Sequence, residues 1–330
     1  LSWIRSYLTH RTQVVSINQS KVINVTSGVP QGSHLGPVLF LLFVNDVTKC
    51  FSHCKYLLFA DDLKSYMKVT DVNDTLKIQH DIDSFWEWCC KNSMSPNIDK
   101  CKTISFTKSS VPIDTSYHIN NNVLSKTDTV LDLGVTLDSK LNFSVHIDNV
   151  LSKSFRLCGF VKRHCKNFNN IMVIIKLFST LVRPVLEYCS IIWNPFYKKH
   201  IDRIEKVQKK IVTFILFKLK INKNNYTYCE RLKLIGLQSL ETRRQYQAIT
   251  FGHKALHSKI DCPKIVNMFT LRVPSYNTRI HETVAIGVHR THYGYNSPFV
   301  RIARYINAIS EDLDLFHCSS KTIRRYLLSL

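Results

Sequence analysis

The stretch Tyr56-Leu57-Leu58-Phe59-Ala60-Asp61-Asp62 sets two adjacent acids directly after five apolar or aromatic residues. Such a run predicts a buried strand that ends at or near a hairpin tip, with a second short strand through Tyr66 and Met67. Two carboxylates about 4 Å apart repel each other unless a cation lies between them, and Mg²⁺ prefers oxygen ligands and shares its remaining positions with phosphates. A turn with two Asp residues is also a common structural feature, because Asp hydrogen-bonds its own backbone there. The spacing alone leaves both interpretations open.

A loop rich in turn residues, Ser27-Gly28-Val29-Pro30-Gln31-Gly32-Ser33, lies upstream of this strand. Before it we expect the end of a helix at residues 1–9 and a hairpin over Thr12 to Val25. After it, Ser33 is a plausible N-cap and Pro37 falls in the first turn of a helix over Leu35 to Asn45. This helix is apolar on all sides, which predicts that it is buried.

Helical and extended patterns alternate in the next hundred residues. Asn73 to Asn92 reads as a helix with an apolar stripe, and strands are expected near Thr103–Phe106 and Val130–Leu137. The stripe consists of Ile78, Ile82, Phe85, Trp86 and Cys89. The fold class predicted for this part is α+β, with a mixed or antiparallel sheet.

After about residue 145 the pattern becomes helical. One helix is expected over Asn170 to Leu186 and another over residues 200–217. The second has an apolar face of Ile201, Ile204, Val207, Ile211 and Ile215, and an opposite basic face of Arg203, Lys206, Lys209 and Lys210. The basic face suits either contact with a phosphate backbone or ordinary solvation.

Composition and charge exclude several classes of protein. The 330 residues are 45% hydrophobic with nine Gly and nine Pro, which excludes collagen-like and disordered chains. The net charge is +21: residues 1–150 hold 14 basic and 14 acidic side chains, whereas residues 151–330 hold 31 basic and 10 acidic ones. A neutral half joined to a basic half indicates a module that meets a polyanion, most commonly nucleic acid; the alternative is a basic surface that serves only solubility.

The expected location is intracellular, nuclear or cytoplasmic, and not secreted. The longest apolar run, Leu35 to Val44, is too short to cross a bilayer, and no secretory leader is visible. The 11 cysteines lack the tight spacing of a disulfide scaffold, which favours a reducing compartment.

The group Cys50-x-x-His53-Cys54 has zinc-ligand residue types. No second ligand pair follows at the spacing of a zinc finger, so chance clustering in a loop explains the group.

Several motifs taken together resemble the reverse transcriptases of non-LTR retrotransposons, most closely jockey-like elements. The loop Ser27–Ser33 with Leu35-Gly36-Pro37 is similar to their motif B, and Phe59-Ala60-Asp61-Asp62 to motif C. The resemblance continues, in the family's order, through Trp88-Cys89, Asn97-x-x-Lys100-Cys101 (motif D), Leu133-Gly134-Val135-x-Leu137-Asp138, His146-Ile147, Tyr188-Cys189-x-x-x-Trp193-Asn194-Pro195 and Glu230-Arg231-Leu232. It covers about residues 1–245.

The resemblance implies an RNA-directed DNA polymerase with an RNA template, a DNA primer or target, dNTPs and Mg²⁺ or Mn²⁺. Residues 1–138 would form a partial palm with motifs B, C, D and part of E, without motif A and the fingers. Residues 139–220 would form a helical thumb, and residues 221–330 a basic region of unknown role. No membrane partner is expected.

The resemblance also implies roles for individual residues. Asp61 and Asp62 would be metal ligands in two-metal nucleotidyl transfer to a primer 3′-hydroxyl. Lys100 would assist the leaving group, although an ordinary surface lysine is an equal reading. Template or substrate would contact Gly28, Pro30, Gln31, Gly32, Phe59 and Ala60. Arg203, Lys206 and Lys210 would meet the nucleic-acid backbone.

One departure from the family pattern concerns catalysis. Family members carry a further metal-binding Asp upstream of motif B, whereas residues 1–45 contain no Asp or Glu and Asp46 is the first acid. We therefore expect the C-terminal part of a truncated polymerase, inactive alone. The alternative is a non-catalytic nucleic-acid-binding remnant; a structural or interaction protein has no positive sign in the sequence.

Overall fold

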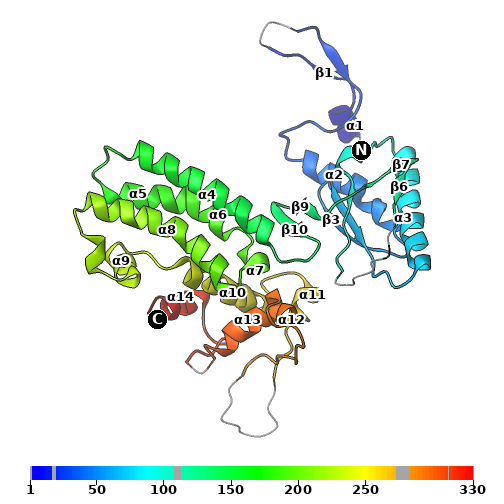
Figure 1. Cartoon of the computed structure of the whole chain (residues 1–330). Coiled ribbons are helices and arrows are strands. Elements are labelled where there is room, and N and C mark those ends of the chain that lie inside the picture. Colours follow the sequence, from blue (N-terminus) through cyan, green and yellow to red (C-terminus); the bar gives the residue numbers. More distant parts are fainter. Residues whose placement is uncertain are drawn as a thin grey trace. The chain divides into compact units, whose positions relative to one another are not determined.

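The computed structural model of the chain describes residues 2–16, 20–107, 113, 115–272, 282–310 and 312–329. These residues form two compact units, 1–130 and 131–330, with the division inside a strand. Each unit is described by itself below. Most of the helices and several of the strands are labelled in Figure 1.

The first unit begins with the expected helix and hairpin. Helix α1 spans Ser2–Leu8, and strand β1 (Arg11–Gln13) pairs antiparallel with β2 (Ile23–Val25). The tip of the predicted hairpin, residues 17–19, lies outside the described residues. The loop from residue 26 then leads to α2 (Gly36–Val44), with Pro37 in its first turn as predicted, and to the 3₁₀ helix η1 (Asn45–Cys50).

The acidic pair lies on the second hairpin, β3 (Lys55–Phe59) and β4 (Asp62–Tyr66), which are antiparallel. Helix α3 (Val72–Lys91) follows, and it starts where predicted because the Asp71 carboxylate accepts the N–H of Asp74 at 3.0 Å. The 3₁₀ turn η2 spans Ile98–Lys100. The remaining short strands are β5 (Lys102–Thr103), β6 (His118–Ile119), β7 (Asn122–Val123), β8 (Ser125–Lys126) and β9 (Thr129–Asp132).

The described strands pair two by two instead of forming one antiparallel sheet. The pairs are β1–β2, β3–β4, β6–β7, β9–β10 and the parallel pair β5–β8, where β10 spans Val135–Asp138. The prediction of an α+β fold is thus confirmed only in its coarse form: the chain combines helices with short strands. A two-stranded pair covers neither of its own faces, so burial in this unit depends on the helices.

Two burial predictions were wrong. In α2 the side chains of Leu41, Leu42 and Phe43 are exposed, and in β3 the side chains of Leu57 and Phe59 are exposed. An element that is apolar on all sides is buried only if neighbours cover all of its sides. Helix α2 packs mainly against η1 at its own C-terminal end, and β3 has only one neighbouring strand.

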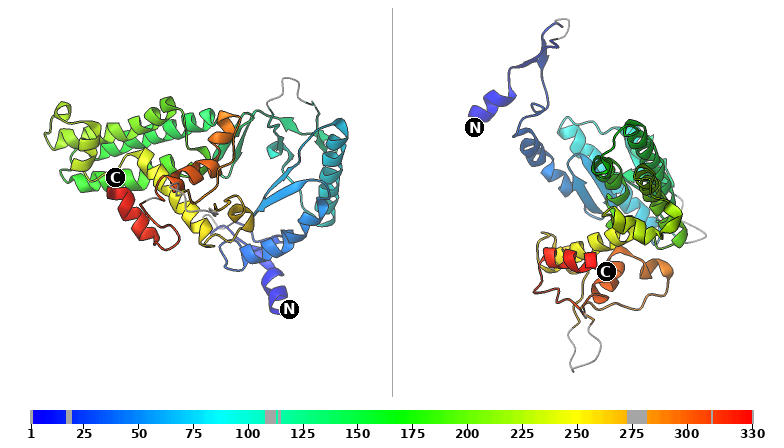
Figure 2. Two further views of the ribbon diagram at one scale, coloured as in Figure 1. Left: turned by 90° about the horizontal axis from the view of Figure 1, so that it is seen from below. Right: turned by 90° about the vertical axis from the view of Figure 1, so that its left-hand side faces the viewer.

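The second unit is helical, as predicted. Helices α4 (Ser144–His164) and α8 (Lys198–Lys218) run side by side, as Figures 1 and 2 both show. The expected helix over Asn170 to Leu186 is continuous in space but contains a π-helical segment, Phe178–Val182, between α5 (Ile171–Leu177) and α6 (Arg183–Glu187). The wider turn accommodates Pro184, which has no N–H to continue an α-helical ladder.

Two hydrophobic cores lie within the second unit. The first includes Val161, Phe178, Leu186 and the predicted apolar face of α8, of which Ile204, Val207, Ile211 and Ile215 are buried. The second is built by α10 (Leu240–Leu256), α13 (Pro298–Asn307) and α14 (Ser320–Ser329). The other helices are α7 (Ser190–Trp193), η4 (Lys223–Asn225), α9 (Tyr228–Leu234), α11 (Pro263–Val266) and α12 (His292–Tyr295). Among the described helices none combines the length and apolar character needed to span a membrane.

Candidate catalytic site and nucleic-acid interface

The acidic pair occupies the tip of the β3–β4 hairpin. Phe59 is paired with Asp62 in the register, and Ala60 and Asp61 form the turn, with Ala60 at φ +51°. Both Asp side chains are exposed, and neither makes a hydrogen bond or an ion pair with any described residue. The tight turn therefore leaves two neighbouring carboxylates with oxygen lone pairs free for an external cation. This donor set fits Mg²⁺, which takes oxygen ligands.

Phe59 presents an aromatic surface beside the acids. Its side chain is 63% exposed even though it ends a strand of mostly apolar residues. An exposed aromatic ring next to two carboxylates is suited to stacking on a sugar or a base. Phe59, Ala60, Asp61 and Asp62 are thus brought together by one hairpin.

The glycine-containing loop has open space beside Gly28 and Gly32. Gly28 and Gly32 have φ of +75° and +81°, and a Cβ added at either would meet no atom within 4 Å. The backbone there is accessible to a close-lying ligand, and positive φ favours glycine. The loop is held from one side by Arg11, whose guanidinium donates to the carbonyl oxygens of Ser27 (3.1 Å) and Gly28 (2.6 Å). Its Gln31 side chain is exposed.

The end of this loop corrects the predicted N-cap. The N-cap position of α2 is Leu35, which has no capping side chain, because the helix starts at Gly36. The hydroxyl of Ser33 still accepts the N–H of Gly36 at 3.0 Å and donates to the carbonyl of Pro30 at 2.8 Å. A side chain at position 36 would meet those same two oxygens at 3.0 and 3.2 Å, so the close turn needs glycine.

Lys100 lies on a separate element from the hairpin and the glycine loop. It ends the turn η2, its N–H donates to the carbonyl of Asn97 at 3.0 Å, and its side chain is exposed. This placement agrees equally with a proton donor and with a surface lysine.

The three basic residues predicted to meet a phosphate backbone differ in their surroundings. The guanidinium of Arg203 is paired with the carboxylate of Asp148 at 2.6 Å, and the ammonium of Lys210 lies 4.3 Å from the centre of the Phe155 ring. Lys206 is exposed and has no partner among the described residues. The basic face of α8 is therefore partly neutralised within the chain.

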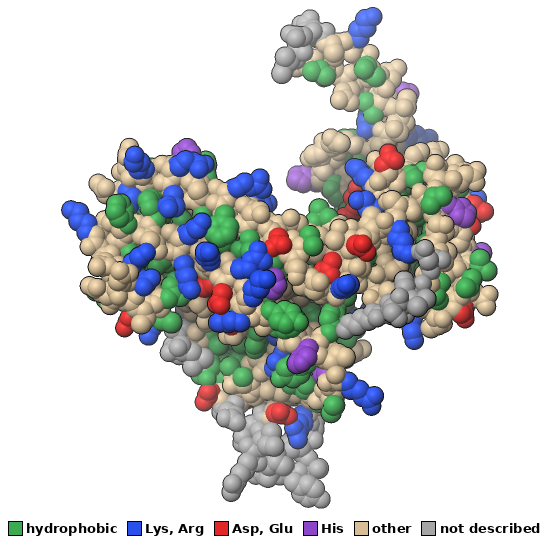
Figure 3. Space-filling model, in the orientation of Figure 1, with side chains coloured by type: hydrophobic (Ala, Val, Ile, Leu, Met, Phe, Trp, Pro, Cys, Tyr) green, Lys and Arg blue, Asp and Glu red, His purple; other side chains and the backbone are tan. Residues whose placement is uncertain are grey.

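Figure 3 shows how charges are distributed on one face of the molecule. Over the helical unit, Lys and Arg side chains clearly outnumber Asp and Glu side chains. This part of the face thus carries an excess of positive charge, although Arg203 and Lys210 have internal partners.

The sequence motif around Trp193 forms part of a small cavity of about 60 Å³ in the second unit. Its walls include Trp193, Asn194 and Tyr197, and the buried guanidinium of Arg301 lines it as well. Arg301 donates to the carbonyl oxygens of Asn194 (3.0 Å) and Ile191 (2.6 Å), and burial lowers its pKa to about 10. Sequence reasoning missed Arg301, because it lies over a hundred residues from the motif that it supports.

A buried carboxylate, Glu205, lies on α8 in the same unit. Glu205 accepts hydrogen bonds from the hydroxyl of Tyr228 and from the N–H of Leu240 (3.0 Å). Burial raises the pKa of Glu205, while Tyr228 and the nearby Arg244 act in the opposite direction. Sequence reasoning assigned Glu205 no role, because an acid next to Lys206 on a helix with a basic face resembles an ordinary solvated position.

Comparisons with known proteins agree with the resemblance. Residues 1–137 match the family described as reverse transcriptase (RNA-dependent DNA polymerase). The RNA-directed DNA polymerase from the mobile element jockey of Drosophila funebris is 30% identical over 206 residues, which cover 59% of this chain and 22% of that protein. Its counterpart from Drosophila melanogaster is 27% identical over 223 residues (63% and 24%), and a probable RNA-directed DNA polymerase from transposon X-element of the same species is 27% identical over 227 residues (64% and 24%).

The chain is thus homologous, at moderate identity, to proteins named as polymerases of mobile elements. It spans about a quarter of the length of these relatives. No solved structure matches it.

Proposed function

We propose that this chain, a homologue of the RNA-directed DNA polymerases of jockey-type non-LTR mobile elements, supplies the palm and thumb of such a polymerase. In this proposal residues 1–138 are the palm with motifs B, C, D and part of E, residues 139–220 are the thumb, and residues 221–330 are a basic region that follows it. The partners are an RNA template, a DNA primer or target and a dNTP, inside the cell.

The observation that carries the proposal is the pair of exposed carboxylates at the tip of the β3–β4 hairpin, within the stretch that matches the reverse transcriptase family. Asp61 and Asp62 would hold divalent metal ions, Mg²⁺ or Mn²⁺. When bound, such ions lower the pKa of the attacking hydroxyl and neutralise charge on the leaving pyrophosphate.

The other site residues would position the reactants. Phe59 would pack against the primer end, and Ala60, with its small side chain, would leave room beside it. Gly28, Pro30, Gln31 and Gly32 would let the template and the incoming nucleotide approach the backbone closely. Lys100 would place a positive charge, or a proton, near the leaving group. These roles require side chains and backbone that a ligand can reach, and the exposed hairpin, the open loop and the exposed Lys100 meet this requirement.

The test is primer extension on an RNA template by a chimera. The chain replaces the matching segment of the Drosophila funebris jockey polymerase, and Asp61→Asn is compared with Asp128→Asn. Asp128 is an exposed acid in the same family-matched stretch but outside the motifs, so its substitution is a matched control. We expect Asp61→Asn to abolish synthesis and to leave template binding largely intact, because the amide keeps the shape but loses the charge that holds the metal. Equal activity of Asp61→Asn and Asp128→Asn would show that Asp61 is only a turn residue.

The alternative function, a non-catalytic nucleic-acid-binding remnant, is favoured by the excess of basic side chains in residues 151–330. It predicts strong, salt-sensitive binding of RNA or DNA and no synthesis by the chimera. The same primer-extension experiment separates the two functions.

A further inference from the structure

A buried carboxylate on α3 organises the loop that leads into β3. Asp81, whose side chain is 1% exposed, accepts the backbone N–H of Ser52 at 3.2 Å through Oδ1, and those of His53 (2.9 Å) and Cys54 (2.7 Å) through Oδ2. Burial disfavours the charged form, but these three donors outweigh it and hold the pKa of Asp81 below its usual value. Asp81 is therefore an ionised carboxylate in a fixed position.

One oxygen of this carboxylate lies near an imidazole. A carboxylate offers about four lone-pair sites, and three are taken by the backbone N–H groups. Oδ1, which has only one of those partners, lies 3.6 Å from Nδ1 of His80, beyond hydrogen-bond distance. The thiol of Cys54 also borders Asp81, but burial and the Asp81 charge raise its pKa to about 12, so it stays a neutral, weak donor.

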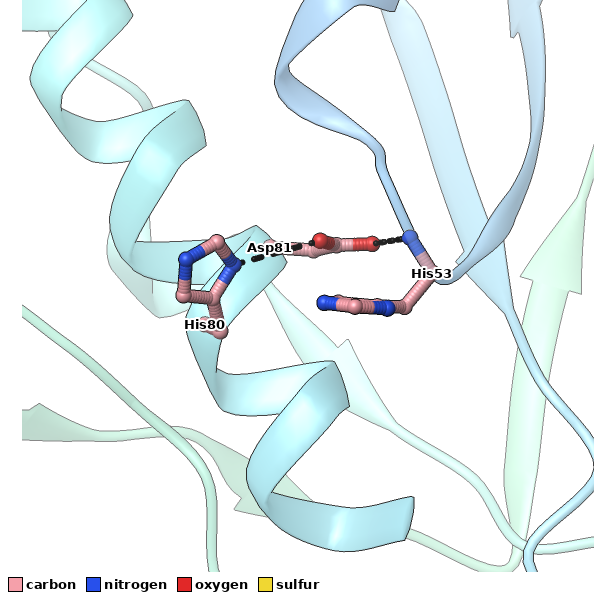
Figure 4. Close-up of side chains that lie close together, drawn as sticks. All are labelled: His53, His80 and Asp81. Atoms are coloured by element: carbon pink, nitrogen blue, oxygen red, sulfur yellow. Dashed lines mark hydrogen bonds and ion pairs between the residues drawn. The ribbon is translucent and has the colours of Figure 1, made fainter.

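A second imidazole completes the group. The rings of His53 and His80 have centroids 5.5 Å apart, and one donor atom from each of His53, His80 and Asp81 lies within 4.8 Å of the others. Figure 4 shows the three side chains converging, with His53 from the loop and the other two from α3. Both imidazoles are exposed, whereas Asp81 is buried.

The spacing is close to that of a tetrahedral zinc site. With Zn–N and Zn–O bonds of about 2.0–2.1 Å, neighbouring donors stand about 3.3–3.4 Å apart. The Oδ1–Nδ1 distance of 3.6 Å between Asp81 and His80 is already near this value. The His53 side chain is exposed, so rotation about its side-chain bonds can bring a ring nitrogen from within 4.8 Å to the same distance. Two imidazoles and one carboxylate leave the fourth position for water.

We propose that His53, His80 and Asp81 form a zinc-binding site that joins the loop before β3 to helix α3. Nitrogen ligands select Zn²⁺ over Mg²⁺, so this site is chemically distinct from the carboxylate pair at the hairpin tip. Zinc bound here stabilises the base of the hairpin that carries Asp61 and Asp62. The proposal does not depend on polymerase activity.

The test measures Zn²⁺ binding by the full chain, stripped of metal and kept reduced, in competition with a chromogenic chelator. We expect one Zn²⁺ per chain at this site, and excess Mg²⁺ should not displace the bound Zn²⁺. The midpoint temperature of thermal unfolding should rise when Zn²⁺ is added and return to its metal-free value when EDTA removes the ion. His53→Ala and His80→Ala should each weaken Zn²⁺ binding by about tenfold or more and remove the thermal shift. Because both side chains are exposed, the metal-free variants should unfold at the wild-type temperature.

Two control variants test whether Zn²⁺ binding is specific to His53 and His80. His34→Ala removes an exposed imidazole from the same unit and should leave Zn²⁺ affinity unchanged. Cys50→Ser removes the cysteine that the sequence places three residues before His53, and it should also leave the affinity unchanged. Wild-type affinity in both His53→Ala and His80→Ala, or loss of binding in Cys50→Ser alone, would overturn the proposal.

Discussion

The hydroxyl of Tyr188 donates a hydrogen bond to the carbonyl oxygen of Leu133, 2.9 Å away and 55 residues earlier in the chain. Leu133 and Gly134 form the two-residue turn between β9 and β10, and both have positive φ, +43° and +84°. The Tyr188 ring lies against this turn, since a Cβ added at Gly134 would stand 3.2 Å from its Cε1. Two motifs of the sequence, one around Gly134 and one beginning at Tyr188, are thus parts of one packed feature.

This contact predicts that Gly134→Ala lowers the free energy of unfolding of the second unit by about 1–2 kcal/mol. Positive φ disfavours alanine by about 1 kcal/mol, and the new methyl group must displace the Tyr188 ring. The matched control is Gly287→Ala, where a Cβ meets nothing within 4 Å and φ is not positive. Urea unfolding followed by circular dichroism measures both variants, and equal stability of the two would contradict the packing argument.

We expect the chain by itself not to extend a primer on an RNA template. Two adjacent carboxylates at one turn do not supply the full ligand set of two metal ions, and residues 1–45 contribute no further acid. Misplaced or missing ligands commonly reduce rates by orders of magnitude. Incorporation of labelled dNTPs by the purified chain, dependent on both template and Mg²⁺, would refute this prediction.

The salt dependence of nucleic-acid binding should reveal which basic residues of α8 contact phosphates. Lys206→Gln removes an exposed ammonium that has no partner among the described residues. It should lower the slope of log affinity against log salt by about 0.9 on duplex DNA or about 0.7 on a single strand. The triple change of Arg203, Lys206 and Lys210 to Gln lowers it by roughly two to three units only if all three side chains leave their internal partners to contact phosphate.

The structure favours a smaller effect for the triple variant, because Asp148 already neutralises Arg203 and the Phe155 ring holds Lys210. Lys77→Gln is the control: it removes one positive charge from the first unit, where Lys77 is paired with Asp74. A slope that stays at the wild-type value in both Lys206→Gln and the triple variant would mean that this face is merely solvated.

The buried Glu205 predicts a pH dependence of stability. Because burial raises its pKa in the folded state, its contribution to stability is fully present below the unfolded value of 4.5 and is lost as the pH rises through the folded pKa. Relative to Glu205→Gln, which stays neutral, the wild-type free energy of unfolding should therefore fall as the pH increases from about 4.5 toward neutrality.

Chemical denaturation of both proteins across this pH range measures the difference directly. Taking the difference removes the contributions of the other acids, which both proteins share. A difference that instead grows in favour of the wild type with rising pH would mean that Arg244 and the N–H of Leu240 stabilise the Glu205 carboxylate more than burial disfavours it.

The elements whose signals are local could be predicted from the amino-acid sequence alone. The strand-turn-strand around Asp61 and Asp62, the helix after Asp71 and the buried stripe of α8 all appear where the pattern predicted them. Turn chemistry, capping and helical periodicity act over a few residues, so they can be read from neighbours along the chain. The roles proposed for the site residues rest on the same local motifs and on homology, and the experiments above test them.

Contacts between groups that are far apart along the chain could not be predicted in this way, because they depend on tertiary packing. The apolar patterns of α2 and β3 predicted burial, yet their side chains are exposed because too few neighbouring elements cover them. The sequence offered only Cys50 and Cys54 as neighbours of His53, whereas the structure brings His53 to His80 and Asp81, which lie on a helix more than 25 residues later. The free energy of burial and of metal or ion pairing depends on neighbours in space, and these neighbours are set by the packing of distant segments and not by local pattern.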